Sequence, residues 1–577
     1  MPRAKTNAEI ADRLELIGDL LELEGAVVYR VLAYRRAARS IRETPDSAAR
    51  LSEQGRLTTL PAVGDTVAAK VAELLASGHI AALDKLEARN PPGIVPVMRI
   101  NGVGPRTARR IFEDLGLVTL EDVIAAARDG RVRELPGLGE RTEQLILDGL
   151  ANGAPPPRPR VSAARLRPFA ERVAEELRAC PAVERCEIAG SLRRYADTAK
   201  DVDLVAAVTN RITAVEAFLE AEWVAEVESR GEAGASALAN DGTRVELRTT
   251  TPPMYGNLLQ HLTGSRDHNV AIREAAVRAG LKVSELGIED VESGQVDTTD
   301  DEREVYARLG LEWIPPELRE NRGELQAARK GTLPTLVEQG MIRGDLHCHT
   351  DWSDGKATLE RMVDAAIGRG LEYLCITDHS PAVGFGMGLD AGRLRAQVER
   401  VRALAAELEP AFTLLVGCEV DILKDGSLDY SDELLADLDV VVASVHAGHR
   451  LDADDQTKRI CAAIENPNVD ILGHPTGRKI GLREPRPLHI DQVISTAVAT
   501  GTVLEVSAQP DRLDLRDSHV RMAVDAGALL AVDTDAHSVE ALDYMRFGVM
   551  NARRGWAPPA QVVNTRQWPE LRSLLKP

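Results

Sequence analysis

The chain of 577 residues is too long for a single hydrophobic core, and its 44% hydrophobic content is that of a globular protein, so three to five domains are expected. No apolar run reaches about 18 residues, which excludes a membrane-spanning helix. Residues 1–10 lack the apolar segment of a signal peptide, so we expect a cytoplasmic protein. The six cysteines form no Cys-x-x-Cys pair and are expected to be reduced and buried.

The formal net charge of −20 is unfavourable for binding nucleic acid, but the positive charges are unevenly spread. A local basic face is sufficient for contact with phosphates, whatever the overall charge. Solvated arginines on helix surfaces are the alternative explanation for each cluster. The two clusters are Arg30, Arg35, Arg36, Arg39 and Arg42, and Arg158, Arg160, Arg165 and Arg167.

The N-terminal part is predicted to be helical, because apolar residues between Asn7 and Ser77 recur with a period of about 3.6. Three segments, which begin at Leu60, Ile100 and Leu135, share a glycine-containing hairpin pattern followed by the polar start of a helix. In a helix-hairpin-helix motif, such a hairpin aims backbone N–H groups at a DNA phosphate without reading bases. Gly-x-Gly also closes ordinary helical hairpins, so the prediction depends on the repetition. The expected DNA-binding glycines are Gly64, Gly102, Gly104, Gly137 and Gly139.

The centre of the chain carries residues suited to phosphoryl transfer. Gly190-Ser191-Leu192-Arg193-Arg194 predicts a turn and a short basic helix, whose N–H and guanidinium donors suit phosphate. Asp201 and Asp203 follow on a predicted strand, where the side-chain period of two places both carboxylates on one face. Paired carboxylates repel each other unless a cation such as Mg²⁺ or Mn²⁺ lies between them. An Asp-rich turn beside solvated arginines is the alternative, which the combination of both patterns disfavours.

These patterns resemble those of the X family of DNA polymerases, nucleotidyltransferases with Gly-Ser-x-Arg-Arg and Asp-x-Asp in the palm. The resemblance continues in Thr263-Gly264-Ser265-Arg266-Asp267-His268-Asn269 and Arg273, and it extends to about residue 317. It implies that Asp201, Asp203 and Glu246 bind two catalytic Mg²⁺ or Mn²⁺ ions. The residues that it implies for binding the nucleotide are Gly190, Ser191, Arg194, Thr263, Gly264, Ser265, Asn269 and Arg273.

Several positions depart from the family pattern. Glu246 stands where the family has aspartate, which leaves the strength of catalysis in question. Ala62 replaces a glycine of the first hairpin, and His261-Leu262 replaces the Tyr-Phe pair, so sugar discrimination is open. Lys70, which we include among the DNA contacts, falls where lyase members carry a Schiff-base lysine, but the supporting lysines of those members are replaced here.

Histidine usage changes after Met341, because nine of the chain's 12 histidines lie beyond it, most at the ends of apolar runs. Helical stretches separate these runs, which predicts parallel β/α units with polar groups at the carboxyl ends of the strands, a barrel geometry. A single histidine at a strand end is commonly structural. The number found here, together with Asp354, Glu419 and Asp535, indicates a metal centre.

This part resembles the PHP (polymerase and histidinol phosphatase) superfamily, a distorted (β/α)7 barrel that holds up to three metals. Mixed imidazole and carboxylate ligands suit Mn²⁺, Zn²⁺ or Fe²⁺, and such ions activate water for attack on a phosphodiester. Arg450 and Lys424 are candidates for steadying the phosphate. The resemblance implies three ligand groups, two of which share Glu419 as a bridging ligand. The first ion would be held by His347, His349, Asp535 and Glu419, and the second by Glu419, His446 and His474. The third would be held by Asp354, His379 and His537.

The predicted fold class is therefore multidomain: α-helical helix-hairpin-helix domains, an α/β nucleotidyltransferase palm with an α+β thumb, and a C-terminal distorted (β/α)7 PHP barrel. The predicted boundaries are 1–80 for a DNA-end-binding domain, 81–152 for helix-hairpin-helix fingers, 153–160 for a Pro-rich linker, 161–254 for the palm, 255–317 for the thumb, 318–340 for a second linker and 341–577 for the PHP domain.

The function expected from these parts is a bacterial-type repair polymerase that fills short gaps, joined to a PHP 3′-5′ exonuclease or 3′-end-processing phosphoesterase. Gapped or nicked duplex DNA and deoxynucleoside triphosphates are the expected partners, and family precedent favours a monomer. The alternative is chiefly a 3′-end nuclease or phosphatase whose weak palm positions DNA. A small-molecule phosphatase is disfavoured, because the three hairpins and the palm would then have no role.

Overall fold

The computed structural model describes residues 6–91, 93–100, 103–136, 138–151, 160–231, 233–383, 387–448 and 451–576, without the side chains of residues 148–151. Two compact units are present: Met1–Pro159 with Ile212–Leu247, and Arg160–Arg211 with Arg248–Pro577. Nearly all of the predicted linker 153–160 lies outside the described residues, as do Gly102, Gly137 and Arg450.

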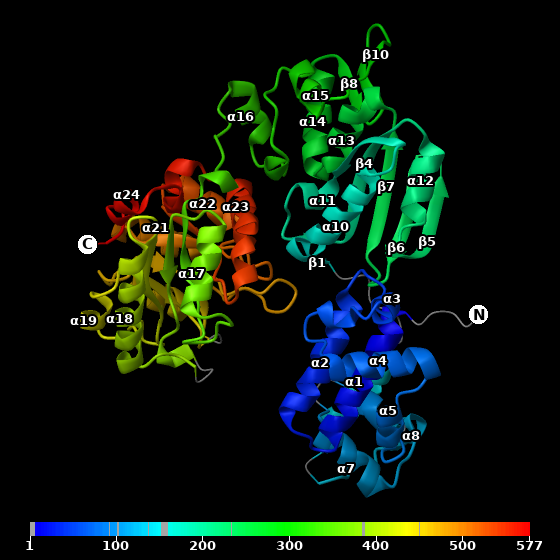
Figure 1. The fold of residues 1–577 in the computed structure, drawn as a ribbon. Helices are drawn as coiled ribbons and strands as arrows, with labels where there is room; N and C mark the ends of the chain where they lie inside the picture. Colours follow the sequence, from blue (N-terminus) through cyan, green and yellow to red (C-terminus); the bar gives the residue numbers. More distant parts are fainter. Residues whose placement is uncertain are drawn as a thin grey trace. The chain divides into compact units, whose positions relative to one another are not determined.

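The first unit begins with a bundle of helices (Figure 1). Ile10, Leu14 and Ile17 of the first helix are buried, as the helical period predicted. A single apolar cluster runs from Ile10 to Ile146, so the two predicted helical domains share one core. The helices are α1 (Asn7–Leu23), α2 (Val28–Glu43), α3 (Ala48–Glu53), α4 (Asp65–Ser77), α5 (Ala81–Glu87), α6 (Ile94–Met98), α7 (Pro105–Leu115), α8 (Leu120–Arg128) and α9 (Glu140–Ala151).

The described residues contain no single helix long and apolar enough to cross a membrane. One bent pair, α4 with α5, meets that test of length and composition when its two helices are joined.

Part of the predicted palm belongs to the first unit. Asn240 Nδ2 donates to the carbonyl oxygen of Pro45 at 3.1 Å, and Arg50 forms an ion pair with Glu222, so these palm elements are attached to the helices. Strands β5 and β6 pair antiparallel. The elements are α12 (Arg211–Leu219), β5 (Val224–Gly231), β6 (Gly234–Ala239) and β7 (Arg244–Thr250), whose last residues pass into the second unit.

The second unit contains the other palm elements and the thumb. Strand β2 pairs antiparallel with β4, and the thumb carries a small antiparallel sheet in the order β10-β9-β8. The palm elements here are β1 (Val161–Ser162), α10 (Ala163–Arg178), β2 (Val183–Ile188), α11 (Gly190–Arg193), β3 (Thr198–Ala199) and β4 (Asp201–Val208). The thumb elements are α13 (Tyr255–Thr263), α14 (Arg266–Arg278), β8 (Leu281–Ser284), β9 (Gly287–Asp290), β10 (Val296–Asp297), α15 (Glu302–Arg308) and α16 (Glu324–Lys330).

The rest of the second unit is a barrel of seven parallel strands in chain order, from β11 to β17. A bridge between Cys348 and Ala536 joins the first strand to the segment after the last, which confirms the predicted (β/α)7 barrel. The strands are β11 (Gly344–Cys348), β12 (Tyr373–Ile376), β13 (Thr413–Asp421), β14 (Val440–Ser444), β15 (Ile471–Leu472), β16 (Val503–Ser507) and β17 (Leu530–Asp533).

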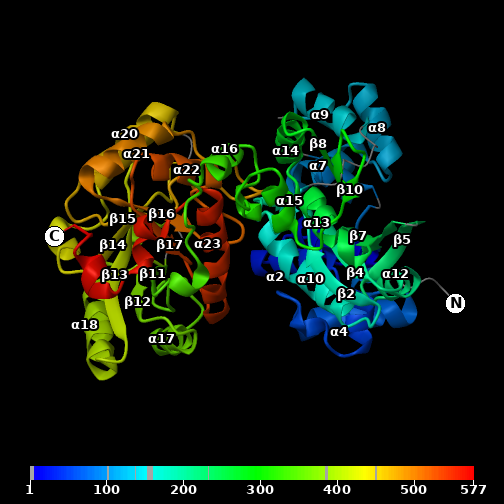
Figure 2. The ribbon, with the colours of Figure 1, turned by 90° about the horizontal axis from the view of Figure 1, so that it is seen from above.

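Helices lie outside these strands (Figure 2), so the strands are buried on both faces and read as continuous apolar runs. The helices are α17 (Leu359–Gly368), α18 (Ala391–Leu408), α19 (Asp432–Leu435), α20 (Ala453–Ile464), α21 (Ile490–Thr500), α22 (Asp517–Asp525), α23 (Met545–Arg554) and α24 (Trp568–Arg572).

Candidate metal centre and nucleotide site

The nine predicted barrel ligands all lie at or just beyond the carboxyl ends of strands or in the loops that follow them. His347 is the fourth residue of β11, and Glu419 is the seventh of the nine residues of β13. Two ligands have a left-handed backbone, His474 with φ 25° and Asp535 with φ 50°. Such strained positions in non-glycine residues persist where the surrounding structure holds them, and they are concentrated at functional sites. The remaining ligands are His349, Asp354, His379, His446 and His537.

Glu419 lies at the centre of the cluster. Its Oε2 is 2.8 Å from His379 Nδ1 and 3.5 Å from His347 Nε2. Its Oε1 is 2.9 Å from His474 Nε2 and 3.4 Å from His446 Nε2. The two oxygens of one carboxylate therefore face different histidines, which is the arrangement that a bridging ligand requires.

Several atoms of the cluster are buried without a hydrogen-bond partner. They include both carboxylate oxygens of Glu419, Nε2 of His347 and both ring nitrogens of His349. Unpartnered buried polar atoms cost on the order of 1–3 kcal/mol each, so a fold that gathers them needs a compensating partner. Nitrogen and carboxylate oxygen in this mixture suit a divalent transition metal, so the residues present fit the expected ions.

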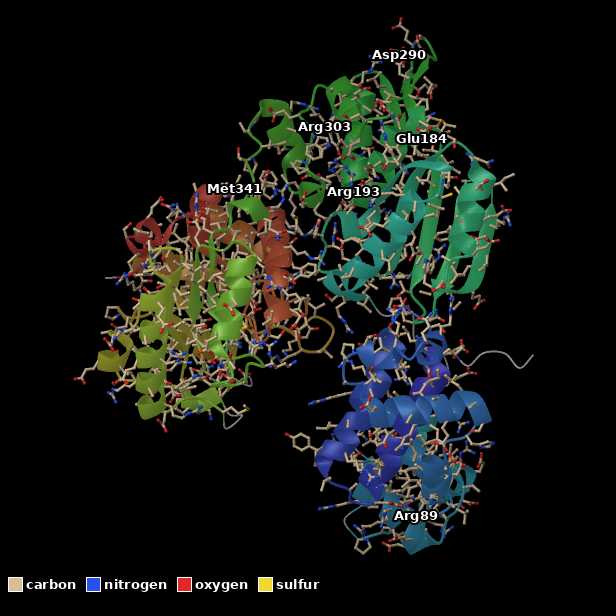
Figure 3. All side chains as sticks on the ribbon, in the orientation of Figure 1. Arg89, Glu184, Arg193, Asp290, Arg303 and Met341 are labelled. Atoms are coloured by element: carbon tan, nitrogen blue, oxygen red, sulfur yellow. The ribbon has the colours of Figure 1, made fainter. Side chains whose placement is uncertain are left out.

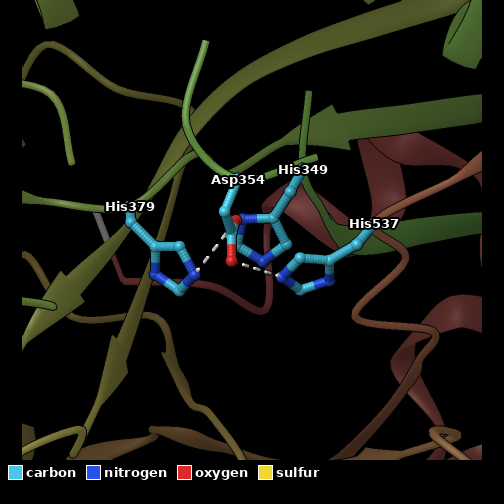
Figure 4. A group of neighbouring side chains, drawn as sticks. All are labelled: His349, Asp354, His379 and His537. Atoms are coloured by element: carbon cyan, nitrogen blue, oxygen red, sulfur yellow. Dashed lines mark ion pairs between the residues drawn. The ribbon is translucent and has the colours of Figure 1, made fainter. Parts of the chain in front are cut away.

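Among the residues that the structure describes, three sets of side chains are close enough together to hold an ion. Asp354 lies 3.5 Å from His379 and 3.3 Å from His537, measured between carboxylate oxygens and Nε2 atoms (Figure 4). The sequence placed His349 and His379 in one group each, whereas the structure places each of them in two. The sets are His349, Asp354, His379 and His537; His347, His349 and Asp535; and His379, Glu419 and His446.

Two carboxylates that the sequence did not single out support the ligands from behind. Glu505 Oε1 on β16 lies 2.6 Å from His347 Nδ1, and Asp421 Oδ2 lies 3.2 Å from His446 Nδ1. A metal-binding histidine usually gives its second ring nitrogen to such a carboxylate, which fixes the tautomer and the orientation of the ring. The signal was present in the sequence, because each acidic residue interrupts an apolar strand.

Burial also sets the charge of the ligands. It lowers the pKa of His349 to about 3 and that of His474 to about 4, so both rings are neutral at physiological pH. Burial alone would raise the pKa of Glu419, but the imidazoles of His379 and His446 hold it well below its usual range. Burial would lower the pKa of His446 and that of His537, but neighbouring carboxylates raise both to about 9, so an ion that binds these rings would displace their protons.

The cations near the site differ from those expected. Lys424 is exposed and does not border the cavity beside the ligands, and Arg450 lies outside the described residues. That cavity has a volume of about 620 Å³. The cations that border it are Lys356, Lys479, Arg483 and Arg512.

In the palm, Asp201 and Asp203 lie on the same face of β4, and the alternate residues Val202 and Leu204 are fully buried behind them. Gly190 has a φ of 59°, and a side chain there would overlap the carboxylate of Asp203. Glycine is therefore required at this turn by both its backbone angle and its neighbour.

The two arginines of the turn have different roles. Arg193 (Figure 3) donates to Glu302 at 2.7 and 2.8 Å and to Thr263 Oγ1 at 2.7 Å, so it ties the palm to the thumb. Arg194 donates from Nε to Glu320 Oε1 at 3.1 Å and from Nη1 to the carbonyl oxygen of Thr263 at 2.6 Å. A triphosphate at Arg194 would compete with Glu320 for its guanidinium.

The predicted nucleotide segment is anchored in the thumb. The Ser265 side chain accepts a hydrogen bond from the His268 N–H at the start of α14. Asn269 Nδ2 donates to the carbonyl oxygen of His261 at 2.7 Å, whereas Arg273 is exposed. Gly264 has a φ of 63°, a conformation that favours glycine.

Glu246 lies on β7, in the first unit, where its Oε2 is 3.2 Å from Arg244 Nη1. Asp201 and Asp203 belong to the second unit. The role of Glu246 as the third palm ligand therefore stays a prediction.

The hairpin glycines have open space around them. Gly64 caps α4 with a φ of −93°, and Gly104 caps α7 with a φ of −78°, angles that any residue adopts. An added Cβ at Gly64, Gly104 or Gly139 meets no atom within 4 Å. Neither the backbone nor the internal packing therefore requires glycine, whereas a phosphate drawn up to these N–H groups would. Ala62, in contrast, has a φ of 62°, and Lys70 is half-buried on α4.

Comparison with known proteins decides the family. Family models match at residues 5–80 (Helix-hairpin-helix domain), 95–152 (SAM-like Helix-hairpin-helix tandem), 258–320 (DNA polymerase beta thumb) and 345–471 (PHP domain). The chain is 36% identical over 570 residues to "DNA polymerase/3'-5' exonuclease PolX" of Bacillus subtilis (strain 168), covering 98% of this chain and 99% of the relative. The chain belongs to the PolX family.

Two further relatives are shorter than this PolX-family chain. A probable phosphatase of Thermoanaerobacter sp. (strain X514) is 32% identical over 33% of this chain and 78% of its own length. A probable phosphatase of Edwardsiella ictaluri (strain 93-146) is 28% identical over 39% of this chain and 90% of its own length. The resemblance to family X polymerases with a PHP domain is thus confirmed over the full chain.

Removal of the charge on Glu302 is expected to destabilise the thumb of this PolX-family protein. Arg319 is fully buried and lies 3.0 Å from Glu302, so Glu302→Gln would leave a buried cation without its partner, at roughly 3–5 kcal/mol. Urea unfolding followed by Trp313 fluorescence would measure this, because Trp313 Nε1 donates to Glu302 at 3.1 Å. Exposed Glu312→Gln is the matched control, and equal midpoints for the two variants would contradict the expectation.

The carboxylate of Glu302 is also expected to make the stability of the thumb depend on pH in the acid range. Burial would raise the pKa of Glu302, but Arg319 and Arg193 lower it to about 2 from its ordinary 4.5. A depressed pKa stabilises the fold above the unfolded-state value and ceases to do so as the pH falls toward the folded-state value. The contribution of Glu302 is therefore complete above about pH 5 and is lost as the pH falls toward 2.

Proposed function

We propose that this PolX-family chain fills short gaps in duplex DNA with its palm and removes nucleotides or blocking groups from 3′ ends with its barrel. The observation that carries the proposal is the convergence of five histidines on the two oxygens of Glu419, in a chain that also carries Asp201 and Asp203 on one face of β4. The name of the Bacillus subtilis relative, which combines the same two activities, supports it.

In the palm, Asp201, Asp203 and Glu246 would hold Mg²⁺ or Mn²⁺, which neutralises charge on the triphosphate during nucleotide transfer. The N–H groups at Gly190 and Ser191 and the guanidinium of Arg194 would bind phosphate oxygens. Thr263, Gly264 and Ser265 would shape the nucleotide pocket, with Asn269 and exposed Arg273 placed toward the new base pair. Glu302 contributes by holding Arg193, and with it the thumb, against the palm.

In the barrel, the nine ligands would hold up to three ions of Mn²⁺, Zn²⁺ or Fe²⁺. Such ions, when bound, supply a water of lowered pKa for attack on a phosphodiester. Glu505 and Asp421 orient His347 and His446. The cations at the edge of the cavity would attract the DNA backbone.

The proposal includes a monomer that works in the cytoplasm on gapped or nicked DNA with deoxynucleoside triphosphates. Cysteine chemistry supports this compartment, because the six cysteines are free and four of them are buried. Non-sequence-specific DNA binding through the hairpins is the expected mode of recognition.

One gapped duplex tests the main proposal, with primer extension and 3′-end degradation measured on the same substrate. Both activities in the native chain are the expected result. Degradation without extension, in either Mg²⁺ or Mn²⁺, would instead indicate a nuclease whose palm only positions DNA. Extension without degradation would contradict the role of the barrel.

Gly104→Ala should weaken binding to a gapped duplex by roughly 1–3 kcal/mol, the loss of one or two hydrogen bonds to phosphate. The substitution leaves the fold intact, because the new Cβ meets no atom within 4 Å. Fluorescence anisotropy at two salt concentrations measures the change, since phosphate contacts also set the salt dependence. Gly368→Ala on α17, where a Cβ is equally free, is the matched control. Unaltered affinity would remove this hairpin from the DNA contact.

Glu246 is expected to give a palm that prefers Mn²⁺. Its extra methylene moves the carboxylate by about 1 Å, and misplacement of that size can cost on the order of 10²-fold in rate. Manganese accepts irregular coordination, whereas Mg²⁺ demands near-octahedral geometry. Glu246→Asp should therefore change the rate of single-nucleotide addition more in Mg²⁺ than in Mn²⁺. Robust addition in Mg²⁺ that persists unchanged in Glu246→Ala would show that this residue binds no metal.

A further inference from the structure

The cavity beside the barrel ligands has a cationic border. Its volume of about 620 Å³ lies within the range of small-molecule sites, and Asp354, Asp535 and His446 are among the ligands that line it. Bound ions would attract an incoming phosphate, and a cationic side chain at the border would add directed hydrogen-bond donors to that attraction. Of the four cations at the border, Lys356 is exposed, and Lys479, Arg483 and Arg512 are compared below by their contacts.

Arg512 forms a contact with one of the predicted metal ligands, Asp535. Its Nε is 3.8 Å from Asp535 Oδ2, which is too long for a hydrogen bond, and no shorter ion pair of this side chain occurs among the described residues. Lys479 instead lies 3.6 Å from Asp511, and Arg483 Nε donates to the carbonyl oxygen of Gly477 at 2.9 Å. The side chain of Arg512 is 17% exposed, compared with 37% for Lys479.

The backbone around Arg512 is held firmly. Its N–H donates to the carbonyl oxygen of Gln509 at 2.8 Å, and the next residue, Leu513, is buried with a φ of 46°. Asp514 is fully buried and accepts a hydrogen bond from Thr476 Oγ1 at 2.9 Å. The side chain of Arg512 therefore starts from a fixed backbone position, which limits the positions that its guanidinium can reach.

We propose that Arg512 binds the phosphate group that reacts in the barrel. This rests on the proposed phosphoesterase function and assigns the residue that recognises its substrate anion. A guanidinium presents paired N–H donors that match two phosphate oxygens, and the five N–H donors of Arg512 have no short ion-pair partner among the described side chains. Lys479 and Arg483, which contact Asp511 and the carbonyl oxygen of Gly477, receive neighbouring phosphates of the strand.

The test compares Arg512→Ala and Arg512→Lys in the full chain, with Lys424→Ala as the control for loss of an exposed cation outside the cavity. Calorimetric titration of the Mn²⁺-loaded proteins with inorganic phosphate gives the affinity for the anion directly. Hydrolysis of thymidine 5′-(p-nitrophenyl phosphate) gives KM and kcat separately, and metal analysis gives the bound Mn²⁺.

Arg512→Ala is expected to weaken phosphate binding and to raise KM by roughly tenfold or more, with bound Mn²⁺ unchanged. Arg512→Lys should recover part of the affinity, because it restores the charge but not the paired donors. Millimolar guanidinium should restore activity to Arg512→Ala and leave Lys424→Ala unaffected, a rescue that a purely structural role would not produce.

Phosphate affinity in Arg512→Ala equal to that of Lys424→Ala would overturn the proposal. Equal loss of Mn²⁺ from both Arg512 variants, without guanidinium rescue, would also overturn it, because Arg512 would then serve Asp535 and its ion. Failure of the proposed exonuclease is a separate result: a native chain that leaves DNA 3′ ends intact still reports phosphate affinity in the titration.

Discussion

Glu419→Gln is expected to abolish 3′-end degradation, by roughly 10³-fold or more in kcat, and to leave gap filling within about twofold. The substitution keeps the shape of the side chain but removes the charge that faces five histidines, and it replaces one oxygen of the proposed bridging ligand with an amide nitrogen. Single-turnover degradation of a 3′-labelled duplex measures the loss, and metal analysis should show fewer bound ions.

Glu505→Gln is the matched comparison, because it makes the same chemical change in a residue that contacts a predicted ligand and would not itself bind an ion. Glu505 contacts His347 from behind, and loss of such a partner typically costs about 10–100-fold. The expected order of exonuclease activity is therefore native, Glu505→Gln, Glu419→Gln. Full activity in Glu419→Gln, or a larger loss in Glu505→Gln, would refute the central position of Glu419.

Asp203→Asn is expected to abolish nucleotide addition in both Mg²⁺ and Mn²⁺, with degradation of 3′ ends unchanged. Asp203 shares a face of β4 with Asp201, and the absence of a side chain at Gly190 leaves room for its carboxylate. Loss of one carboxylate removes charge that a divalent ion needs at this site. Extension of a one-nucleotide gap measures the effect.

Glu184→Gln provides the control for this prediction, since it removes an exposed carboxylate of β2 in the same part of the palm. Normal addition by Glu184→Gln beside none by Asp203→Asn is the expected result. Addition by Asp203→Asn at a tenth of the native rate or better would mean that the palm ions are held elsewhere.

The barrel was predictable because its chemistry follows the strand pattern. His379, His446 and His474 each follow an apolar run, and parallel strands bring such positions to one end of a barrel. The grouping of the ligands was not predictable in the same way. His349 and His379 each belong to two sets, which depends on side-chain directions across neighbouring strands.

Other contacts could not be predicted from the sequence, because the two partners lie far apart in the chain. Arg194 was expected to bind triphosphate, yet its partner Glu320 lies 126 residues away in a segment that reads as a polar connector. Glu505 interrupts an apolar strand, which marks it as unusual, but its partners, His347 and the N–H of His474, lie 158 and 31 residues away in the chain. Long-range pairs of this kind leave no periodic signal in a sequence.

Polar atoms around Glu419 are buried without partners, so the barrel is expected to be more stable when ions bind there. The supply of the ion would then affect how much of the barrel is folded. An ion that binds only the folded state adds about 1.4 kcal/mol of stability for each tenfold rise in free ion above its Kd. Scarcity of the ion would therefore lower exonuclease capacity in two ways. More sites would be without their ions, and more barrels would be unfolded and exposed to proteolysis. The helical unit, whose apolar cluster contains no barrel residue, would keep its stability under the same conditions.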